Sequence, residues 1–321
     1  MRHILNAEQF EPVQLSKLFN QADYFKETDK KLATRRENMR RHWGRIMLSM
    51  FYEPSTRTRF SFELAAKKLG MDVVGTENAA EFSSAAKGET IEDTIRVFNG
   101  YGADALSLRT KENGMAKRAA KVADIAILNG GDGKGEHPTQ AALDTYTIHS
   151  EFGQLHNLNV TIGGDLSHGR TARSLALLLS KYPGNDITFV STPELRIGDD
   201  IKEKLVTSGT SYTETDTVDI HSLGDADVVY WTRLQLERLD GLMSKEDAAK
   251  KQKEYRIDAA TLEIIPDHAI IMHPLPRVDE ITTDVDNDHR ARFFQQAWNG
   301  LYVRMAMLDQ LMNETNLREN N

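Results

Sequence analysis

Short apolar runs alternate with amphipathic, helix-type segments along most of this chain of 321 residues. Short apolar runs predict buried strands, and a helix between two such strands allows them to pair in parallel. A chain of this length is too long for one ordinary core and suits two α/β domains. The pattern therefore predicts an α/β fold with two doubly wound parallel-sheet domains joined by helices.

In the first half of the chain, an N-terminal helix is expected over Asn6–Lys26. The predicted strands are Arg45–Tyr52, Ala105–Leu108 and Ile125–Leu128. The predicted helices are Thr56–Leu69, which Gly70 closes, Thr90–Asn99, where Thr90 and Asp93 have capping-box spacing, and Pro138–Phe152. The last of these helices is the candidate connection between the domains.

In the second half, the predicted elements are the strands Asn159–Gly163, Asp186–Val190, Asp227–Trp231 and Ala269–Met272 and the helix Arg170–Lys181. The charge-dense segment Leu234–Tyr255 predicts an exposed, mobile excursion. The chain ends in a helix with apolar positions at Phe294, Ala297, Leu301, Met305, Leu308 and Leu311. We expect domains over residues 1–150 and 151–290, with the terminal helix 291–321 packed back on the first.

Composition disfavours several classes of protein. The chain carries 40 basic and 48 acidic residues, a net charge of −8, which disfavours nucleic acid and anionic membranes as partners. It has no cysteine, which excludes disulfides and thiolate catalysis and fits the cytoplasm. Its apolar runs, such as Ala269–Met272, are too short to span a bilayer, and the polar N-terminus predicts no secretory signal.

The segment Glu53-Pro-Ser-Thr-Arg-Thr-Arg59 joins a predicted strand to a predicted helix. In parallel sheets, ligands bind beyond the carboxyl ends of the strands. Ser55, Thr56 and Thr58 supply hydroxyl donors, the first helical turn supplies N–H groups, and Arg57 offers a planar fork for phosphate oxygens. A plain helix cap with solvated arginines is the alternative, but so many donors in one turn favour an anion site.

Three further unusual segments follow predicted strands. His137-Pro-Thr-Gln140 opens a helix with His137 and Gln140 on one face, although a single histidine there is more often a cap or a packed residue. Gly163–Thr171 imitates a dinucleotide-binding turn, but its glycine spacing differs and Arg170 opens the helix. His273-Pro-Leu-Pro-Arg277 makes a stiff turn whose carbonyl groups can face a cleft, with an ordinary proline turn as an even alternative.

Together these segments resemble one family. The runs FYEPSTRTRFSFELAAKKLG, KGET, HPTQAALDTYTI, GDLSHGRTARSL, TRLQLERL and HPLPRVDEI have the order and spacing of the aspartate and ornithine carbamoyltransferases. The resemblance extends from about Arg45 to the C-terminal helix. It implies a carbamoyltransferase whose first domain binds carbamoyl phosphate and whose second binds the amino acid acceptor, without a metal or organic cofactor.

The resemblance implies a set of residues that bind carbamoyl phosphate, namely Ser55, Thr56, Arg57, Thr58, Arg109, His137, Gln140 and Leu275. Thr58, Arg109 and His137 are implied to stabilise the tetrahedral oxyanion, and Arg57 the departing phosphate. The backbone carbonyl of Leu275 is implied to accept a hydrogen bond from the carbamoyl amino group. No side chain is an obvious general base, and the phosphate itself can take the proton.

Aspartate is the expected acceptor. Ornithine enzymes of the family resemble each other in an H-C-L-P segment, whereas this chain has His273-Pro-Leu-Pro276 and no cysteine. The residues that match those holding the two carboxylates of aspartate are Arg170, Thr171, Arg233 and Gln235. The implied reaction gives N-carbamoyl-L-aspartate and phosphate, an early step of de novo pyrimidine biosynthesis.

The resemblance also implies an assembly. Ser83 and Lys87 match a loop that reaches into the neighbouring subunit's site, which implies a homotrimer with shared active sites; association with regulatory chains stays open. Three features of the sequence depart from the family pattern. The stretch between Gly88 and Arg109 is one residue longer, and the other two are Ser167, where lysine is common, and Arg173, where histidine is common.

Three other functions remain open. The nearest is a carbamoyltransferase of the same family that uses another amine. A non-catalytic binding or assembly module is a second, although such a protein has no chemical reason to keep Arg57, His137 and Arg233. The third is a nucleotide-dependent enzyme that uses Gly163–Gly169 as its cofactor turn.

Overall fold

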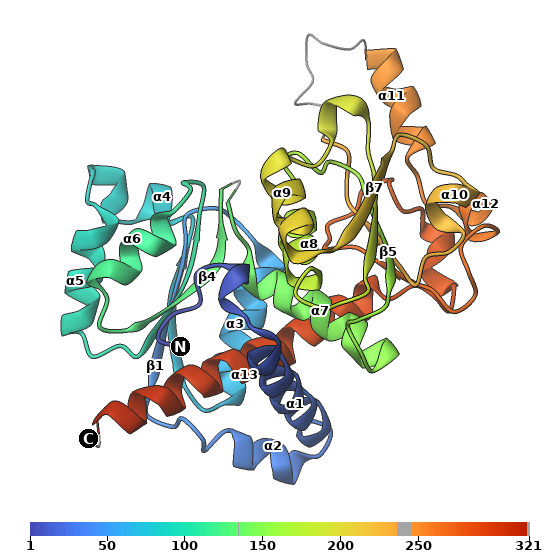
Figure 1. Ribbon diagram of the computed structural model, residues 1–321. Helices are drawn as coiled ribbons and strands as arrows, with labels where there is room; N and C mark the ends of the chain where they lie inside the picture. The colour runs from blue at the N-terminus through green and yellow to red at the C-terminus, as the bar shows by residue number, and fades with distance from the viewer. Residues whose placement is uncertain (134, 236–244, 320–321) are drawn as a thin grey trace. The chain divides into compact units, whose positions relative to one another are not determined.

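The computed structural model describes residues 1–133, 135–235 and 245–319, and the chain forms two compact units (Figure 1). Unit 1 contains Met1–Tyr146 and the chain from Trp298 onward, and unit 2 contains Thr147–Ala297. The chain passes between the units within two helices, α7 (Pro138–Phe152) and α13 (Phe293–Glu319).

Unit 1 is built on a four-stranded sheet in the order β2-β1-β3-β4, with every neighbouring pair parallel. Its strands are β1 (Ile46–Phe51), β2 (Asp72–Glu77), β3 (Ala105–Thr110) and β4 (Ala126–Asp132). Its helices are α1 (Pro12–Thr28), α2 (Leu32–Asn38), α3 (Thr56–Lys68), α4 (Ala79–Phe82), α5 (Ile91–Gly100) and α6 (Met115–Val122), with 3-10 turns η1 (Ala7–Gln9) and η2 (Ser84–Lys87).

Unit 2 contains a five-stranded sheet in the order β7-β6-β5-β8-β9, again parallel throughout. Its strands are β5 (Asn159–Gly163), β6 (Asp186–Val190), β7 (Ser211–Thr215), β8 (Val228–Trp231) and β9 (Ile270–Met272). Its helices are α8 (Arg170–Leu179), α9 (Asp199–Ser208), α10 (Ile220–Leu223), α11 (Lys245–Glu254) and α12 (Ala259–Leu262), with 3-10 turns η3 (Pro193–Leu195) and η5 (Thr283–Asn287). Each sheet begins near its middle and grows to both sides, which confirms the predicted fold class.

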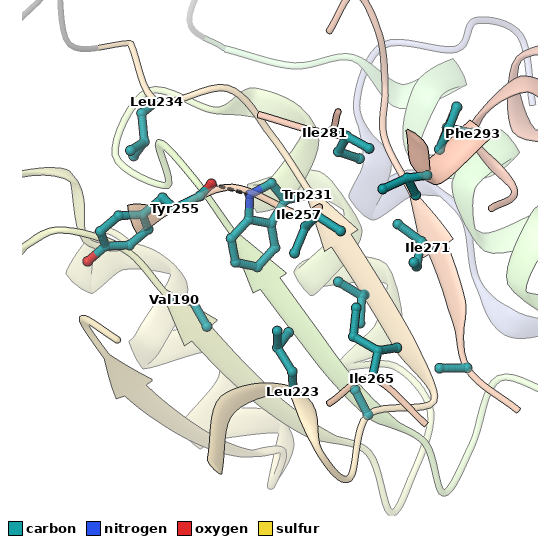
Figure 2. Packing of buried hydrophobic residues seen from close by; sticks show 14 of the residues in the cluster. Val190, Leu223, Trp231, Leu234, Tyr255, Ile257, Ile265, Ile271, Ile281 and Phe293 are labelled. Carbon is teal, nitrogen blue, oxygen red and sulfur yellow. Dashed lines mark hydrogen bonds between the residues drawn. The ribbon is translucent and has the colours of Figure 1, made fainter. Parts of the chain in front are cut away.

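The core of unit 2 lies against β8 and β9, as Figure 2 shows. Trp231 at the end of β8 is fully buried, and its indole N–H donates to the backbone oxygen of Tyr255 at 2.9 Å. Leu223, Ile257 and Ile271 belong to the same cluster. The hydrogen bond satisfies the one polar atom of the indole, so the ring can be buried without an unpaired donor.

Two of the predicted elements need correction. The N-terminal helix α1 begins at Pro12 instead of Asn6, after the separate turn η1. In the predicted mobile excursion, residues 236–244 lie outside the described residues, but residues 245–254 form α11. Leu234 and Tyr255, at its two ends, are only 4% and 3% exposed and belong to the core of unit 2. The prediction of an exposed excursion is therefore wrong at both ends of this segment.

The predicted apolar face of the last helix is also only partly right. Met305, Leu308 and Leu311 are buried, but Phe294 is 45% exposed and its neighbour Phe293 is fully buried instead. Sequence periodicity could not choose between two adjacent phenylalanines at the start of a helix. Within the described part of the chain, no helix has the length and apolar character needed to cross a membrane.

Candidate active site

The turn between β1 and α3 carries the first group of site residues. Ser55 precedes the helix, but its side chain makes no capping hydrogen bond, so the N–H groups of the first turn are left to other acceptors. Arg59 forms ion pairs with Glu63 at 3.8 Å and Glu77 at 3.4 Å, whereas exposed Arg57 pairs with nothing in the described ranges. Loss of solvent around its guanidinium lowers the pKa of Arg57. Of the two arginines, Arg57 is the one suited to an external anion.

Thr58 and Arg109 lie together at the carboxyl ends of β1, β3 and β4. Both flank Gly130, because a Cβ at that glycine would lie 3.5 Å from Thr58 Cγ2 and 3.7 Å from Arg109 Cβ. Arg109 donates to the backbone oxygen of Gly130 at 3.1 Å and pairs with Glu53 at 3.1 Å. These contacts fix the guanidinium beside the start of α3, so Thr58 and Arg109 can face one small ligand.

His137 and Gln140 open α7 on the same side of unit 1. The His137 side chain is buried, and its Nδ1 lies 3.5 Å from the hydroxyl of Thr139. The Gln140 amide donates to Asp144 one turn further on, at 2.8 Å. Both predicted side chains are thus held by polar neighbours near the start of α7. The His137 ring can still donate to a carbonyl oxygen, and the Gln140 side-chain oxygen can still accept from an amide N–H.

Leu275 in unit 2 has an unusual backbone, with φ of 54° and a cis bond to Pro276. A leucine in the left-handed region persists only where the surroundings hold it. Its N–H donates to His273 Nδ1 at 2.8 Å, and His273 Nε2 lies 2.8 Å from Glu280. Glu280 also accepts from the N–H of Val278 at 3.0 Å. This buried pair of side chains fixes the turn that orients the Leu275 carbonyl.

We expect Glu280→Gln to lower the free energy of unfolding at neutral pH by about 1–3 kcal/mol, because it weakens the bonds to His273 and the turn. Burial alone would raise the pKa of Glu280, but His273 and backbone N–H groups outweigh it and hold the pKa below 4.5. The contribution of ionised Glu280 to the free energy of unfolding is therefore complete above about pH 4.5. It is lost as pH falls through the lower pKa that Glu280 has in the folded state.

Urea unfolding of wild type and variant from pH 7 downward checks this expectation, with the exposed Glu263→Gln as the matched control. The difference between wild type and Glu280→Gln should shrink below pH 4.5. A difference that stays constant with pH would contradict the role given to the Glu280 charge.

The second group of site residues in unit 2 follows β5 and β8, which are parallel neighbours. The loops after these strands leave the same edge, and the Thr232 N–H ties them together by donating to Gly163 O at 2.8 Å. The half-buried residues on them are Arg170, Thr171, Arg233 and Gln235. The sheet therefore brings the two predicted carboxylate-binding pairs to one edge.

The glycines of the same turn have a packing explanation. A Cβ on Gly163 would lie 2.2 Å from the Trp231 ring, and one on Gly164, at φ of 114°, 2.2 Å from Thr232 O. The packing of β5 against β8 is by itself sufficient to require glycine at both positions. The turn therefore gives no support to a nucleotide cofactor.

Ser83 and Lys87, the predicted neighbour-directed residues, lie at the two ends of η2. The Ser83 hydroxyl accepts from the Ala85 N–H at 3.2 Å, which shapes the turn. Lys87 is exposed and forms no ion pair with any residue in the described ranges. Neither side chain bonds to the Ser55–Thr58 segment of its own chain in those ranges, so within one chain the structure does not bring them together with it.

The two substituted positions near the aspartate residues differ in their surroundings. Ser167 is exposed. Arg173 is half-buried and forms an ion pair with Asp200 at the start of α9. The arginine thus links α8 to α9 and is occupied within unit 2.

Sequence reasoning missed several residues that surround the predicted ones. They are Glu53, Thr139, Asp144, Glu280 and Arg304. The spacing of Gln140 and Asp144, four residues apart on a helix, was a usable signal. Over residues 1–133, 135–235 and 245–319, no cluster of three or more histidine or acidic side chains could hold a metal ion.

The fold and these residues define a two-unit α/β protein with groups suited to small anions at the strand ends of each unit. Sequence comparison identifies its family. The profile of the aspartate/ornithine carbamoyltransferase carbamoyl-P binding domain matches residues 2–150, and that of the Asp/Orn binding domain matches residues 156–311. The chain belongs to the aspartate/ornithine carbamoyltransferase family.

Individual relatives support the same family assignment. The chain is 48% identical over 311 residues to the chloroplastic aspartate carbamoyltransferase of Oryza sativa, covering 96% of this chain and 84% of the relative. It is 46% identical over 273 residues to the aspartate carbamoyltransferase catalytic subunit of Methanocella arvoryzae, covering 84% and 85%. Among solved structures, the catalytic subunit of M. jannaschii aspartate transcarbamoylase matches with a TM-score of 0.89 and 38% identity, over 98% and 99% of the two chains. The Trypanosoma cruzi enzyme in complex with N-(phosphonacetyl)-L-aspartic acid matches with a TM-score of 0.86 and 37% identity, over 96% and 95%.

Proposed function

We propose that this protein transfers the carbamoyl group of carbamoyl phosphate to the amino group of L-aspartate, giving N-carbamoyl-L-aspartate and phosphate. The domain over residues 1–150, to which the terminal helix 291–321 returns, binds carbamoyl phosphate, and that over 151–290 binds aspartate. A relative that uses another amine acceptor is the alternative within the family.

The observation that carries aspartate as the acceptor is the pair of arginines, Arg170 and Arg233, that follow adjacent strands of unit 2. Two guanidinium groups suit a ligand with two carboxylates, and each charge-assisted bond contributes about 1.5–3 kcal/mol. Ornithine would instead bring a cationic side chain, which arginine repels. The T. cruzi relative has been crystallised with carbamoyl phosphate and aspartate.

In the first chemical step, the neutral amine of aspartate attacks the carbonyl carbon of carbamoyl phosphate. A C–N bond forms and the carbonyl oxygen becomes an oxyanion. Thr58, Arg109 and His137 donate to that oxygen. The adjacency of Thr58 and Arg109 around Gly130 supports this role.

In the second step, the bond between the carbonyl carbon and the phosphate oxygen breaks. Arg57, with Ser55, Thr56 and the first-turn N–H groups of α3, stabilises the negative charge on the departing phosphate. The phosphate takes the proton that the amine loses. Gln140 and the Leu275 carbonyl hold the carbamoyl amino group, so catalysis consists mainly of orientation and electrostatics.

We also propose a homotrimer in which Ser83 and Lys87 act in the neighbouring subunit's site. The family resemblance supports it, and so does the exposure of large apolar side chains around the edge of the unit 1 sheet. Phe60 and Leu64 on α3 are 48% and 49% exposed, and Val74 on the edge strand β2 is 62% exposed. A subunit contact over this face would remove them from water.

The proposed reaction is an early step of de novo pyrimidine biosynthesis, and we place it in the cytoplasm. Plant relatives are named chloroplastic, so a plastid is the alternative location. Archaeal relatives are named catalytic subunits, which supports regulatory chains as additional partners.

We expect aspartate to support phosphate release from carbamoyl phosphate, and ornithine and putrescine to support none above background. The physical reason is the preference of Arg170 and Arg233 for carboxylates. A colorimetric phosphate assay with each acceptor in turn measures this, with a reaction lacking acceptor as the control for hydrolysis. Equal turnover with ornithine would overturn the assignment of the acceptor.

A further inference from the structure

Arg304 on α13 is a buried cation that the proposed chemistry does not use. It is 3% exposed, and its guanidinium carbon lies 5.0 Å from the centre of the Phe62 ring. Burial lowers the pKa of Arg304 to about 10, the charge of Asp144 opposes this effect, and that of Arg109 adds to it. Arg304 therefore remains protonated at neutral pH, where loss of hydration is costly unless its N–H groups are used.

One of those N–H groups reaches the start of α7. Arg304 Nη2 donates to the hydroxyl of Thr139 at 3.2 Å, and both residues are buried. The same hydroxyl lies 3.5 Å from Nδ1 of His137. A buried cation of the last helix is thereby connected through one hydroxyl to an imidazole of the proposed oxyanion site.

The direction of the hydrogen bond between Arg304 and Thr139 follows from the chemistry of the two groups. A guanidinium can only donate, so the Thr139 oxygen must accept from Arg304. The hydroxyl hydrogen is then available for donation to the nearby Nδ1. A neutral imidazole that accepts at Nδ1 carries its proton on Nε2. This tautomer is the one that can donate from Nε2 to a developing oxyanion.

Asp144 supplies a second link on the same helix. It is fully buried, its Oδ1 accepts from the Gln140 amide at 2.8 Å, and its negative charge acts on Arg304. An amide that donates to Asp144 keeps its own oxygen for another donor. Arg304 is therefore linked indirectly to both His137 and Gln140, the two side chains that would contact the carbamoyl group.

We infer that Arg304 and Thr139 are positioning residues that hold His137 as the Nε2-protonated tautomer for donation to the carbamoyl oxygen. The inference rests on the proposed function for its catalytic consequence, but the tautomer itself can be measured without turnover. Neither residue contacts a substrate in this scheme, since both act through the imidazole.

The most direct test compares Thr139→Val, which removes the hydroxyl at nearly constant shape, with Thr139→Ser, which keeps it. Ring ¹⁵N signals of histidine-labelled full-length protein, with His137 assigned by its loss in His137→Gln, report the tautomer. Wild type and Thr139→Ser should show Nε2 protonated and Nδ1 unprotonated. Thr139→Val should show a mixture of tautomers, with kcat about tenfold lower and KM for aspartate unchanged.

Arg304→Gln and Arg304→Lys test the other end of the link. Arg304→Gln should move the His137 ring signals in the same direction as Thr139→Val, whereas Arg304→Lys, which can still donate, should restore part of the wild-type pattern. If the Arg304 variants fail to fold, the two Thr139 variants still decide the matter.

Unchanged His137 signals and kcat within twofold of wild type in a folded Thr139→Val protein would overturn the inference. A loss of kcat with unchanged ring signals would also overturn it, because the effect would then be structural. Failure of the proposed function would look different. Wild type itself would then give no carbamoylated product, whatever the tautomer of His137.

Discussion

Arg57→Ala should lower kcat by about a hundredfold or more while leaving the fold intact. The guanidinium at the start of α3 has no hydrogen-bond or ion-pair partner within the described ranges, so its removal breaks no such bond there. Its charge is needed most when negative charge builds on the departing phosphate, which is a property of the transition state. Steady-state kinetics with carbamoyl phosphate and aspartate, together with a thermal unfolding curve, measure both parts of this expectation.

Arg59→Gln is the matched control, because Arg59 lies in the same segment but forms ion pairs with Glu63 and Glu77. It should lower Tm while leaving kcat within a few-fold of wild type. If Arg57→Ala instead raises KM for carbamoyl phosphate at an unchanged kcat, Arg57 binds only the ground state and the catalytic role given to it is wrong.

Lys87→Ala should also be nearly inactive, and it should regain activity when mixed with Arg57→Ala. Lys87 ends the turn η2 as an exposed cation and forms no ion pair with a described residue of its own chain. In the proposed trimer, an intact site needs Arg57 from one chain and Lys87 from its neighbour. Random mixing of equal amounts gives such a pairing at about a quarter of the sites.

The experiment dissociates the two pure variants, mixes them, allows reassociation and compares activity with each variant treated alone. Activity approaching about a quarter of wild type is expected. Mixed trimers that are demonstrated by a charge tag but show no recovered activity would mean that each site is built from a single chain.

The buried parts of the fold could be predicted from the sequence. The strands β5 (NVTIG) and β6 (DITFV) have the predicted bounds, because each combines buried apolar residues with β-branched ones in a short segment. The strands β2 (DVVGTE) and β7 (SYTET), each at one edge of its sheet, went unpredicted, because neither contains an apolar run long enough to indicate a buried strand.

The residues of the candidate site were likewise only partly predictable from the sequence. Arg57, Thr58 and His137 could be singled out because they stand in short segments at the ends of predicted strands. Arg304 could not, because an arginine on the last helix gives no sign of the residues it will meet some 165 positions earlier. Contacts between distant segments depend on how the helices pack, and a single sequence does not determine this.

The identity of the product is the sharpest test of whether this protein carbamoylates aspartate. The protein is incubated with ¹³C-carbamoyl phosphate and unlabelled aspartate, and the reaction is followed by ¹³C NMR beside a phosphate assay. We expect the label to move into N-carbamoyl-L-aspartate, with one phosphate released for each product formed. Label that stays in carbamoyl phosphate, or that appears only as bicarbonate, would contradict it.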